Sequence, residues 1–192
     1  MKFNFLIIWF LVWMPESTCI NNNYLKTIDA YLNADSVAEK SKYMADNYRA
    51  YFMNEKDEGE NKSQALQSFQ NWDGPMHPDV KINSYTFGNG MWKVTFNEQN
   101  DFSKAIDFPG WNGTTTFTFN SAGLIEETIY VPDSNNISYK PFLQPALDWL
   151  QKNMPGELSE VYQNNKLVKT ETAANKWKQL LQQWQLQKNP KE

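Results

Sequence analysis

A predicted β-hairpin over residues 111–133 constrains the fold of this chain more than any other stretch. Two β-rich runs, residues 114–119 and 124–131, flank a short polar turn that ends in Gly123. Glycine takes a positive φ without steric cost, which tight hairpin turns often require. The pattern therefore predicts two consecutive antiparallel strands.

Side-chain alternation divides the hairpin residues between the two faces of the predicted sheet. If Phe119 pairs with Leu124, the first face carries Thr115, Phe117, Phe119, Thr128 and Tyr130. The opposite face carries Ile125, Ile129 and Val131. Because both faces carry apolar side chains, we expect both to be covered by other parts of the chain.

Composition narrows the classes of function. The chain has 192 residues, of which 41% are hydrophobic and 15% aromatic, enough for a sizeable core. Its net charge of -4 and the lack of a basic stripe argue against a nucleic-acid partner. A single cysteine excludes an internal disulfide, and one cysteine with one histidine argues against a metal site built from those residues. We expect no metal and no cofactor.

Residues 1–19 are predicted to be an export signal. Lys2 precedes an apolar run over residues 3–14, which has secretory length and is too short to span a bilayer comfortably. Cys19 lies where a bacterial lipoprotein signal places its lipidated residue, although Glu16 departs from that pattern. An ordinary signal peptide and an uncleaved anchor are the alternatives. We expect an exported, cell-envelope protein, either lipid-anchored through Cys19 and a tether over residues 20–23, or otherwise periplasmic or secreted.

The rest of the chain predicts an α+β plan, with helices packed on one side of a curved sheet. Helices are expected over residues 24–32, 36–45 and 63–72, with caps at Asp35 or Ser36 and at Ser63. Residues 73–75 (Asp-Gly-Pro) are expected to end the third helix. Strands are expected over residues 48–53, 80–85 and 91–96, and exposed loops over residues 54–62 and 98–104.

This order resembles the nuclear transport factor 2-like superfamily, in particular its SnoaL-like and ketosteroid-isomerase-like branches. The resemblance rests on residues 31–35 (Tyr-Leu-Asn-Ala-Asp), on residues 43–48 leading into the first strand and most strongly on residues 116–127, closing at Asp133. It assigns residues 20–136 to one domain. It implies a cone, in which a curved antiparallel sheet wraps around the N-terminal helices and leaves a pocket at its open end.

The catalytic residues of the resembled enzymes are mostly missing. In the isomerase branch, the position of the oxyanion tyrosine corresponds to Ile28, and that of the base to Phe52 or a neighbour. The position of the hairpin acid corresponds to Thr115, so none of the three matches. The cyclase branch implies an acid at the hairpin end, which Asp133 matches, and a preceding histidine, which residues 107–110 lack. The only histidine, His77, is predicted to lie in a loop.

The sequence therefore favours a non-catalytic pocket for a small apolar or amphipathic ligand. The predicted ligand-binding residues are Tyr31, Phe69, Trp72, Trp92, Phe96, Thr115, Phe117, Thr128 and Tyr130. The alternative is a cyclase- or isomerase-type enzyme that uses Asp133 or Asp46 with Tyr130.

Residues 137–192 are predicted to form a C-terminal helical extension. Helices are expected around residues 142–150, interrupted near Pro145, around 158–162, and after a cap at Thr170. The last helix carries an apolar stripe, Ala173 or Ala174, Trp177, Leu180, Leu181 and Trp184. We expect this stripe to cover the sheet face of Ile125, Ile129 and Val131. The alternatives are a homodimer and a scaffold that binds another envelope protein.

Overall fold

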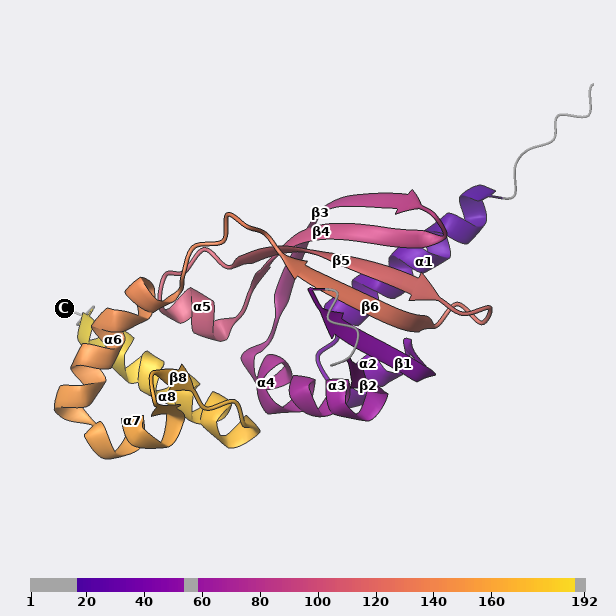
Figure 1. The fold of residues 1–192 in the computed structure, drawn as a ribbon. Coiled ribbons are helices and arrows are strands. Elements are labelled where there is room, and N and C mark those ends of the chain that lie inside the picture. Colours follow the sequence, from indigo (N-terminus) through magenta and orange to yellow (C-terminus); the bar gives the residue numbers. More distant parts are fainter. Residues whose placement is uncertain (1–16, 54–58, 189–192) are drawn as a thin grey trace, which may run out of the picture.

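The computed structural model describes residues 17–53 and 59–188, with side chains from residue 23 onward (Figure 1). The apolar run of the predicted export signal therefore lies outside the described residues, and so does the Cys19 side chain. Helix α1 (Ser17–Leu32) starts before Cys19 and continues through residues 20–23, which were expected to be a tether. Lipidation at Cys19 remains a prediction.

The chain is α+β, as predicted, and is built on a six-stranded curved sheet (Figure 1). Its strands are β1 (Met44–Phe52), β2 (Glu60–Asn61), β3 (Asp79–Gly88), β4 (Met91–Gln99), β5 (Trp111–Phe119) and β6 (Ile125–Pro132). They lie in the order β2-β1-β6-β5-β4-β3. The sheet is mixed rather than wholly antiparallel, because β1 pairs in parallel with β6.

Helices occupy the inner side of the sheet and one end of it. After α1 they are α2 (Val37–Ser41), α3 (Lys62–Ser68), the π-helical turn η2 (Phe69–Asp73), α4 (Gly74–Met76) and α5 (Asp101–Ala105). The C-terminal extension contributes α6 (Lys140–Asn153), α7 (Pro155–Val161), the small hairpin β7 (Tyr162–Gln163) and β8 (Lys166–Leu167), and α8 (Glu171–Lys188).

The β5–β6 hairpin forms as predicted, but its register differs by two residues. Phe117 pairs with Thr128, because a bulge shifts the register between Thr118 and Phe119. A bulge adds one residue to one strand and thereby changes which side chains face inward. Ile125, expected on the outer face, is consequently fully buried in the inner core, whereas Val131 is exposed on the outer side.

Two helix boundaries near the N-terminus differ from the sequence prediction. Helix α2 ends at Ser41, so Met44 and Ala45 are buried residues at the start of β1. Helix α3 is capped by Asn61 rather than Ser63. The Asn61 side chain accepts a hydrogen bond from the Gln64 backbone at 3.0 Å, and the Gln64 side chain accepts one from the Asn61 backbone at 2.9 Å. This capping box satisfies two backbone donors at once.

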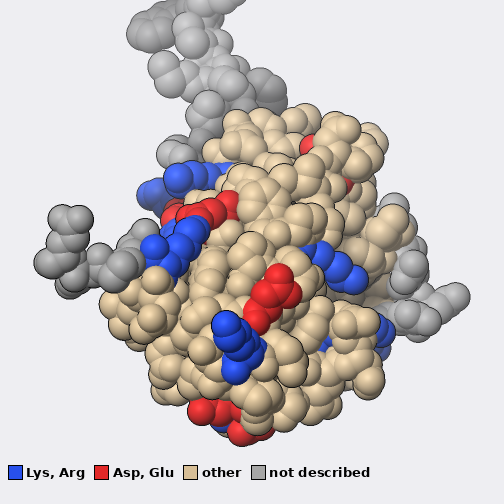
Figure 2. Space-filling model, turned by 90° about the vertical axis from the view of Figure 1, so that its left-hand side faces the viewer, with Lys and Arg blue, Asp and Glu red and all other residues tan. Residues whose placement is uncertain are grey.

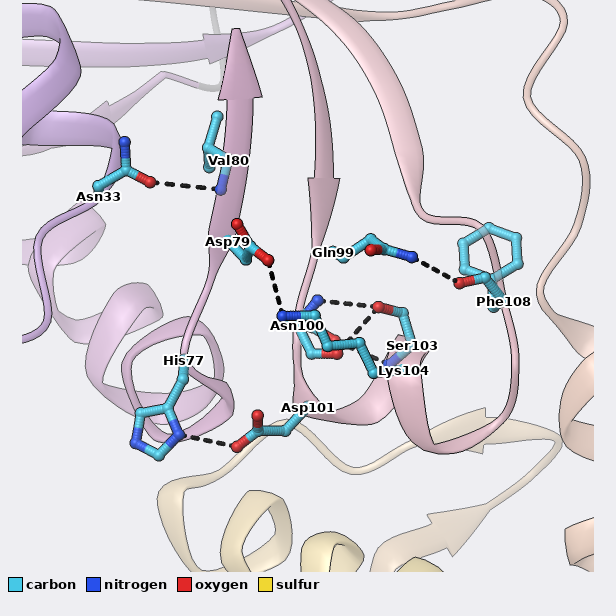
Figure 3. A network of polar contacts seen from close by, with 10 residues as sticks. All are labelled: Asn33, His77, Asp79, Val80, Gln99, Asn100, Asp101, Ser103, Lys104 and Phe108. Atoms are coloured by element: carbon cyan, nitrogen blue, oxygen red, sulfur yellow. Dashed lines mark hydrogen bonds and ion pairs between the residues drawn. The ribbon is translucent and has the colours of Figure 1, made fainter.

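The segment after β4 was wrongly predicted to be a loop. Glu98 and Gln99 still belong to β4, and Asn100 then caps α5. A polar network fixes this corner (Figure 3): His77 Nδ1 lies 2.7 Å from Asp101 Oδ2, and Lys104 Nζ lies 2.7 Å from Asp79 Oδ2. The network holds the end of β4, and with it Glu98, in a defined position.

The described residues form two hydrophobic cores. The first lies between α1 and the inner face of the sheet and contains Ile28, Tyr31, Met44, Tyr48, Trp92, Val94, Phe96, Phe117 and Ile125. The second joins the C-terminal helices to η2, α4 and the β4–β5 connection; its members include Trp72, Met76, Phe102, Ile106, Phe108, Leu150, Trp177 and Leu181.

The C-terminal extension packs on its own chain, but at a different place from the one expected. The whole predicted stripe of α8 is buried, in contact with α4, α5 and η2 at the end of the cone (Figure 1). It forms a core with Phe102, Ile106 and Phe108 rather than with Ile129 and Val131. Pro145 lies inside α6 without interrupting it.

The outer surface of the extension carries charges of both signs. Figure 2 shows this end of the molecule, where lysine and acidic side chains are scattered among other residues. Within residues 17–53 and 59–188, no helix combines the length and the apolar character needed to cross a membrane. In the same part of the chain, no group of three or more His, Cys, Asp or Glu side chains is arranged to hold a metal ion.

Candidate functional site

A cavity of about 390 Å³ lies between the helices α1, α3 and η2 and the inner face of the sheet. Its aromatic walls are Tyr31, Tyr48, Tyr51, Phe69, Trp72, Phe96, Trp111 and Tyr130. Its polar groups include Lys40, Asp73, Glu98, Asn100, Thr115, Thr128 and Lys169. The volume suits a small organic molecule, and a wall that combines aromatic side chains with convergent polar groups is typical of ligand sites.

Three buried hydroxyl groups form a chain along one side of the cavity. The Tyr31 hydroxyl lies 2.7 Å from the Tyr48 hydroxyl, which lies 2.6 Å from Thr128 Oγ1. Burial raises the pKa of Tyr31 and of Tyr48, so both remain neutral at physiological pH. Each hydroxyl can therefore donate a hydrogen bond, either to its neighbour or to a ligand atom.

Two carboxylates face the cavity without a protein partner. No hydrogen bond or ion pair joins the side chain of Asp73 or Glu98 to any other residue that the structure describes. The pKa of Glu98 is raised to about 7, chiefly by burial and in part by the Asp73 carboxylate, while Lys40 and Lys169 act to lower it. Burial also raises the pKa of Asp73. Near neutral pH, Glu98 can therefore either hold or release a proton.

Two lysines complete the charged part of the site. Lys40 Nζ donates a hydrogen bond to the Tyr31 carbonyl at 2.9 Å, and it lies 4.0 Å from the centroid of the Tyr31 ring. Lys169 comes from the C-terminal extension, and its Nζ lies 5.9 Å from the centroid of the Trp72 ring. The extension thus contributes a cation to a site formed mainly by the preceding domain.

Seven of the nine predicted ligand-binding residues line this cavity: Tyr31, Phe69, Trp72, Phe96, Thr115, Thr128 and Tyr130. The other two, Trp92 and Phe117, are buried in the first core outside the cavity lining. The Trp92 indole nitrogen has no hydrogen-bond partner among the described residues.

The carboxylates named from the sequence do not line the cavity. Asp46 is exposed on β1, where its carboxylate lies 3.3 Å from Lys62 Nζ. Asp133 is exposed after β6, and it accepts a hydrogen bond from the Asn135 backbone at 2.9 Å. His77 is exposed and pairs with Asp101. Tyr130, the third residue of the enzymatic alternative, does line the cavity.

Sequence reasoning missed Asp73, Glu98, Lys40 and Lys169. A signal for Glu98 was present, since Trp92, Val94 and Phe96 alternate inward and Glu98 continues their period of two. Asp73 was interpreted as part of a helix stop because glycine and proline follow it, yet the helix continues through η2 into α4.

Comparisons with known proteins give a resemblance of shape only. No protein-family model matches the chain, and no curated protein matches it. An NTF2-like protein of unknown function from Cytophaga hutchinsonii aligns at 10% identity and a TM-score of 0.45, over 65% of this chain and 94% of its own. A delta 5-3-ketosteroid isomerase from a Mycobacterium species aligns at 14% identity and a TM-score of 0.45, over 56% of this chain and 91% of its own. AusH from Aspergillus nidulans aligns at 11% identity and a TM-score of 0.49, over 61% of this chain and 88% of its own. Similarities this weak say nothing about the activity or ligand of this chain.

Proposed function

We propose that this chain binds a small amphipathic organic molecule in the cavity between its helices and its sheet. The observation that carries the proposal is the pairing of aromatic walls with unpartnered carboxylates. Phe96 and Tyr130 stack with ring centroids 6.0 Å apart, and the cavity between the elements is not filled by side chains. A ligand with an apolar body would cover these rings, and its polar end would supply the hydrogen bonds that Asp73 and Glu98 lack.

A fragment screen by ligand-observed NMR tests this proposal. Small aromatic alcohols, amides and amines should bind the purified chain saturably. Ala65→Phe, which adds a ring to the cavity wall on α3, should abolish that binding. Ala38→Phe, the same substitution at an exposed position on α2, is the matched control and should leave it intact. Binding that is equal in both variants would contradict the cavity as the site.

Acid–base catalysis is the second candidate, favoured by one specific observation. Glu98 faces the cavity with a pKa of about 7, which suits a group that takes and returns a proton at neutral pH. The buried hydroxyls of Tyr48 and Thr128 line the same cavity and can donate to a developing oxyanion. In this catalytic alternative the acid–base group is Glu98 rather than Asp46 or Asp133, and Asp73 lines the same cavity.

Deuterium exchange separates the two candidates. If Glu98 removes a proton next to a carbonyl, the protein should accelerate exchange of cyclohexanone α-protons in D2O. Glu98→Gln should lower that acceleration at least about a hundredfold. Fragment binding without any acceleration of exchange would leave a binding protein and no catalyst.

The export prediction completes the proposal with a location. Residues 1–19 and the single Cys19 support a place at a bacterial cell envelope, and lipidation would anchor the domain at a membrane surface. In a bacterial host, metabolic labelling with a palmitate analogue should mark the wild type but not Cys19→Ser. Equal labelling of both forms would contradict lipidation at this residue.

The scaffold alternative has lost its original support. The apolar stripe of α8, which suggested a docking surface, is buried within the chain in the second core. We therefore place the ligand cavity ahead of the C-terminal helices as the functional site.

A further inference from the structure

The amine of Lys40 lines the cavity but has no role in the binding proposal. Its Nζ lies 4.0 Å from the ring centroid of Tyr31 and 4.7 Å from that of Phe69. The hydrogen bond to the Tyr31 carbonyl holds it in place. No ion pair joins Lys40 to a carboxylate within residues 17–53 and 59–188, although the carboxyl groups of Asp73 and Glu98 line the same cavity.

Lys62 donates to the backbone as Lys40 does, but its amine lies in a different environment. It also donates to a backbone carbonyl, that of Met44, at 2.8 Å. Its ammonium, however, pairs with Asp46, whose side chain is fully exposed to water. Solvation and an ion pair keep such an amine protonated, whereas Lys40 has aromatic rings on two sides.

We propose that Lys40 is a nucleophile that forms an imine with an aldehyde or ketone bound in the cavity. The proposal rests on the cavity of the proposed function, because the carbonyl compound must enter it. The class of ligand is thereby narrowed to small molecules with an apolar body and a reactive carbonyl group.

The reaction balances with groups that the cavity contains. The lone pair of neutral Nζ adds to the carbonyl carbon, while the carbonyl oxygen takes a proton from a carboxylic acid. The resulting carbinolamine loses its hydroxyl group as water with a second proton from a carboxylic acid, and the nitrogen returns its two protons to the carboxylates. One amine and one carbonyl compound thus yield one imine and one water, with no oxidant or reductant.

The ionisation of the surrounding groups supports both proton steps. Burial lowers the pKa of Lys40 to about 8, even though Asp73 and Glu98 raise it. About a tenth of the Lys40 amines are then neutral at pH 7, against fewer than about one in a thousand for an ordinary lysine. Burial raises the pKa of Glu98 to about 7, so that the same pH leaves part of it protonated. Desolvation of a lysine is a known way to activate it as a nucleophile.

Reductive trapping on the full chain tests the inference. The protein is treated at pH 7 with dilute benzaldehyde and sodium cyanoborohydride, and peptide mapping by mass spectrometry gives the benzylation rate of each lysine. Lys40 should react at least about tenfold faster than Lys62, which serves as the internal reference. Lys40→Arg, which keeps a positive charge at this position, should remove the fast adduct and leave the others unchanged.

The inference is overturned if Lys40 reacts no faster than Lys62, or if the fast adduct lies on another lysine. Benzyl alcohol has the same ring as benzaldehyde but no carbonyl group. Its binding shows whether the cavity still takes up ligands when no imine forms. Saturable binding of benzyl alcohol without a Lys40 adduct would refute the imine and leave the binding cavity standing. Absence of both would remove the imine and count against the cavity as a site for such ligands.

Discussion

The Tyr48 hydroxyl lies 2.6 Å from Thr128 Oγ1, and so joins two strands that are 80 residues apart in the sequence. The same hydroxyl lies 2.7 Å from that of Tyr31 on α1. One phenol therefore ties the first helix, the first strand and the hairpin together beside the cavity. The pairing of β1 with β6 brings these groups into one place.

Removing that hydroxyl should destabilise the fold. Tyr48→Phe leaves the buried Tyr31 and Thr128 hydroxyls without this partner, so the free energy of unfolding should fall by about 1–3 kcal/mol. Urea denaturation measures the change. Thr95→Val is the control, because it breaks the hydroxyl pair with Ser84, which is of similar length, 2.7 Å, but exposed, and should cost about 0.5 kcal/mol or less. Equal effects would show that the buried chain has no special role.

The unpartnered Glu98 should make stability depend on pH. Its folded-state pKa of about 7 lies above the ordinary 4.5, so the folded state binds the proton more tightly than the unfolded chain. This contribution to stability is fully present below about pH 4.5 and is lost as the pH rises through 7. Glu98→Gln should therefore stabilise the protein at pH 7.5, by about 3 kcal/mol, and hardly at all at pH 4.5.

Urea midpoints at the two pH values measure this difference. Asp73, Lys40, Lys169 and Tyr130 also surround Glu98, so their titration contributes equally to the wild-type and control curves. Glu127→Gln on β6, a position that does not line the cavity, removes the same charge and controls for net charge. A Glu98→Gln variant that is less stable than wild type at pH 7.5 would mean that an ionised Glu98 has a favourable partner.

The C-terminal helix should be part of the folded core rather than an appendage. Leu181 on α8 is buried and Leu186 on the same helix is 55% exposed, which gives two identical substitutions in different settings. Leu181→Ala should lower the free energy of unfolding by about 2–5 kcal/mol, and Leu186→Ala by about 0.5 kcal/mol or less. Thermal denaturation followed by tryptophan fluorescence measures the stability of the two variants. A small effect at both positions would mean that α8 does not pack as described.

Gly113 should be needed for the shape of the cavity. A Cβ at this position on β5 would overlap the ring of Tyr130, whereas a Cβ on Gly88 of β3 would meet no neighbouring atom. Gly113→Ala should push the Tyr130 ring out of place, and the affinity for fragment ligands should fall at least about tenfold, at a cost of about 1–3 kcal/mol in stability. Gly88→Ala should leave affinity unchanged. Isothermal titration of both variants decides the matter, and retained affinity in Gly113→Ala would remove Tyr130 from the binding wall.

Local patterns in the sequence predicted the inner face of the hairpin and the buried stripe of α8. Thr115, Phe117, Thr128 and Tyr130 do share the inner side, because a period of two in side-chain direction holds wherever a strand forms. The α8 stripe was equally clear because every third or fourth residue of the helix is apolar.

The charged part of the site could not be found in the same way. Glu98 follows a run of alternating residues but was interpreted as part of a polar loop, because composition outweighed the alternation at the strand end. Lys40 and Lys169 become neighbours of the cavity only through tertiary packing between distant segments. The parallel pairing of β1 with β6 is likewise non-local, and no short stretch of sequence encodes it.

The most direct test of the central claim is a crystal structure of the chain with its tightest-binding fragment. The account predicts electron density for the ligand against the rings of Phe96 and Tyr130, with a polar atom within hydrogen-bond distance of Glu98 or Asp73. A fragment bound elsewhere, or a cavity closed by its own side chains, would contradict it.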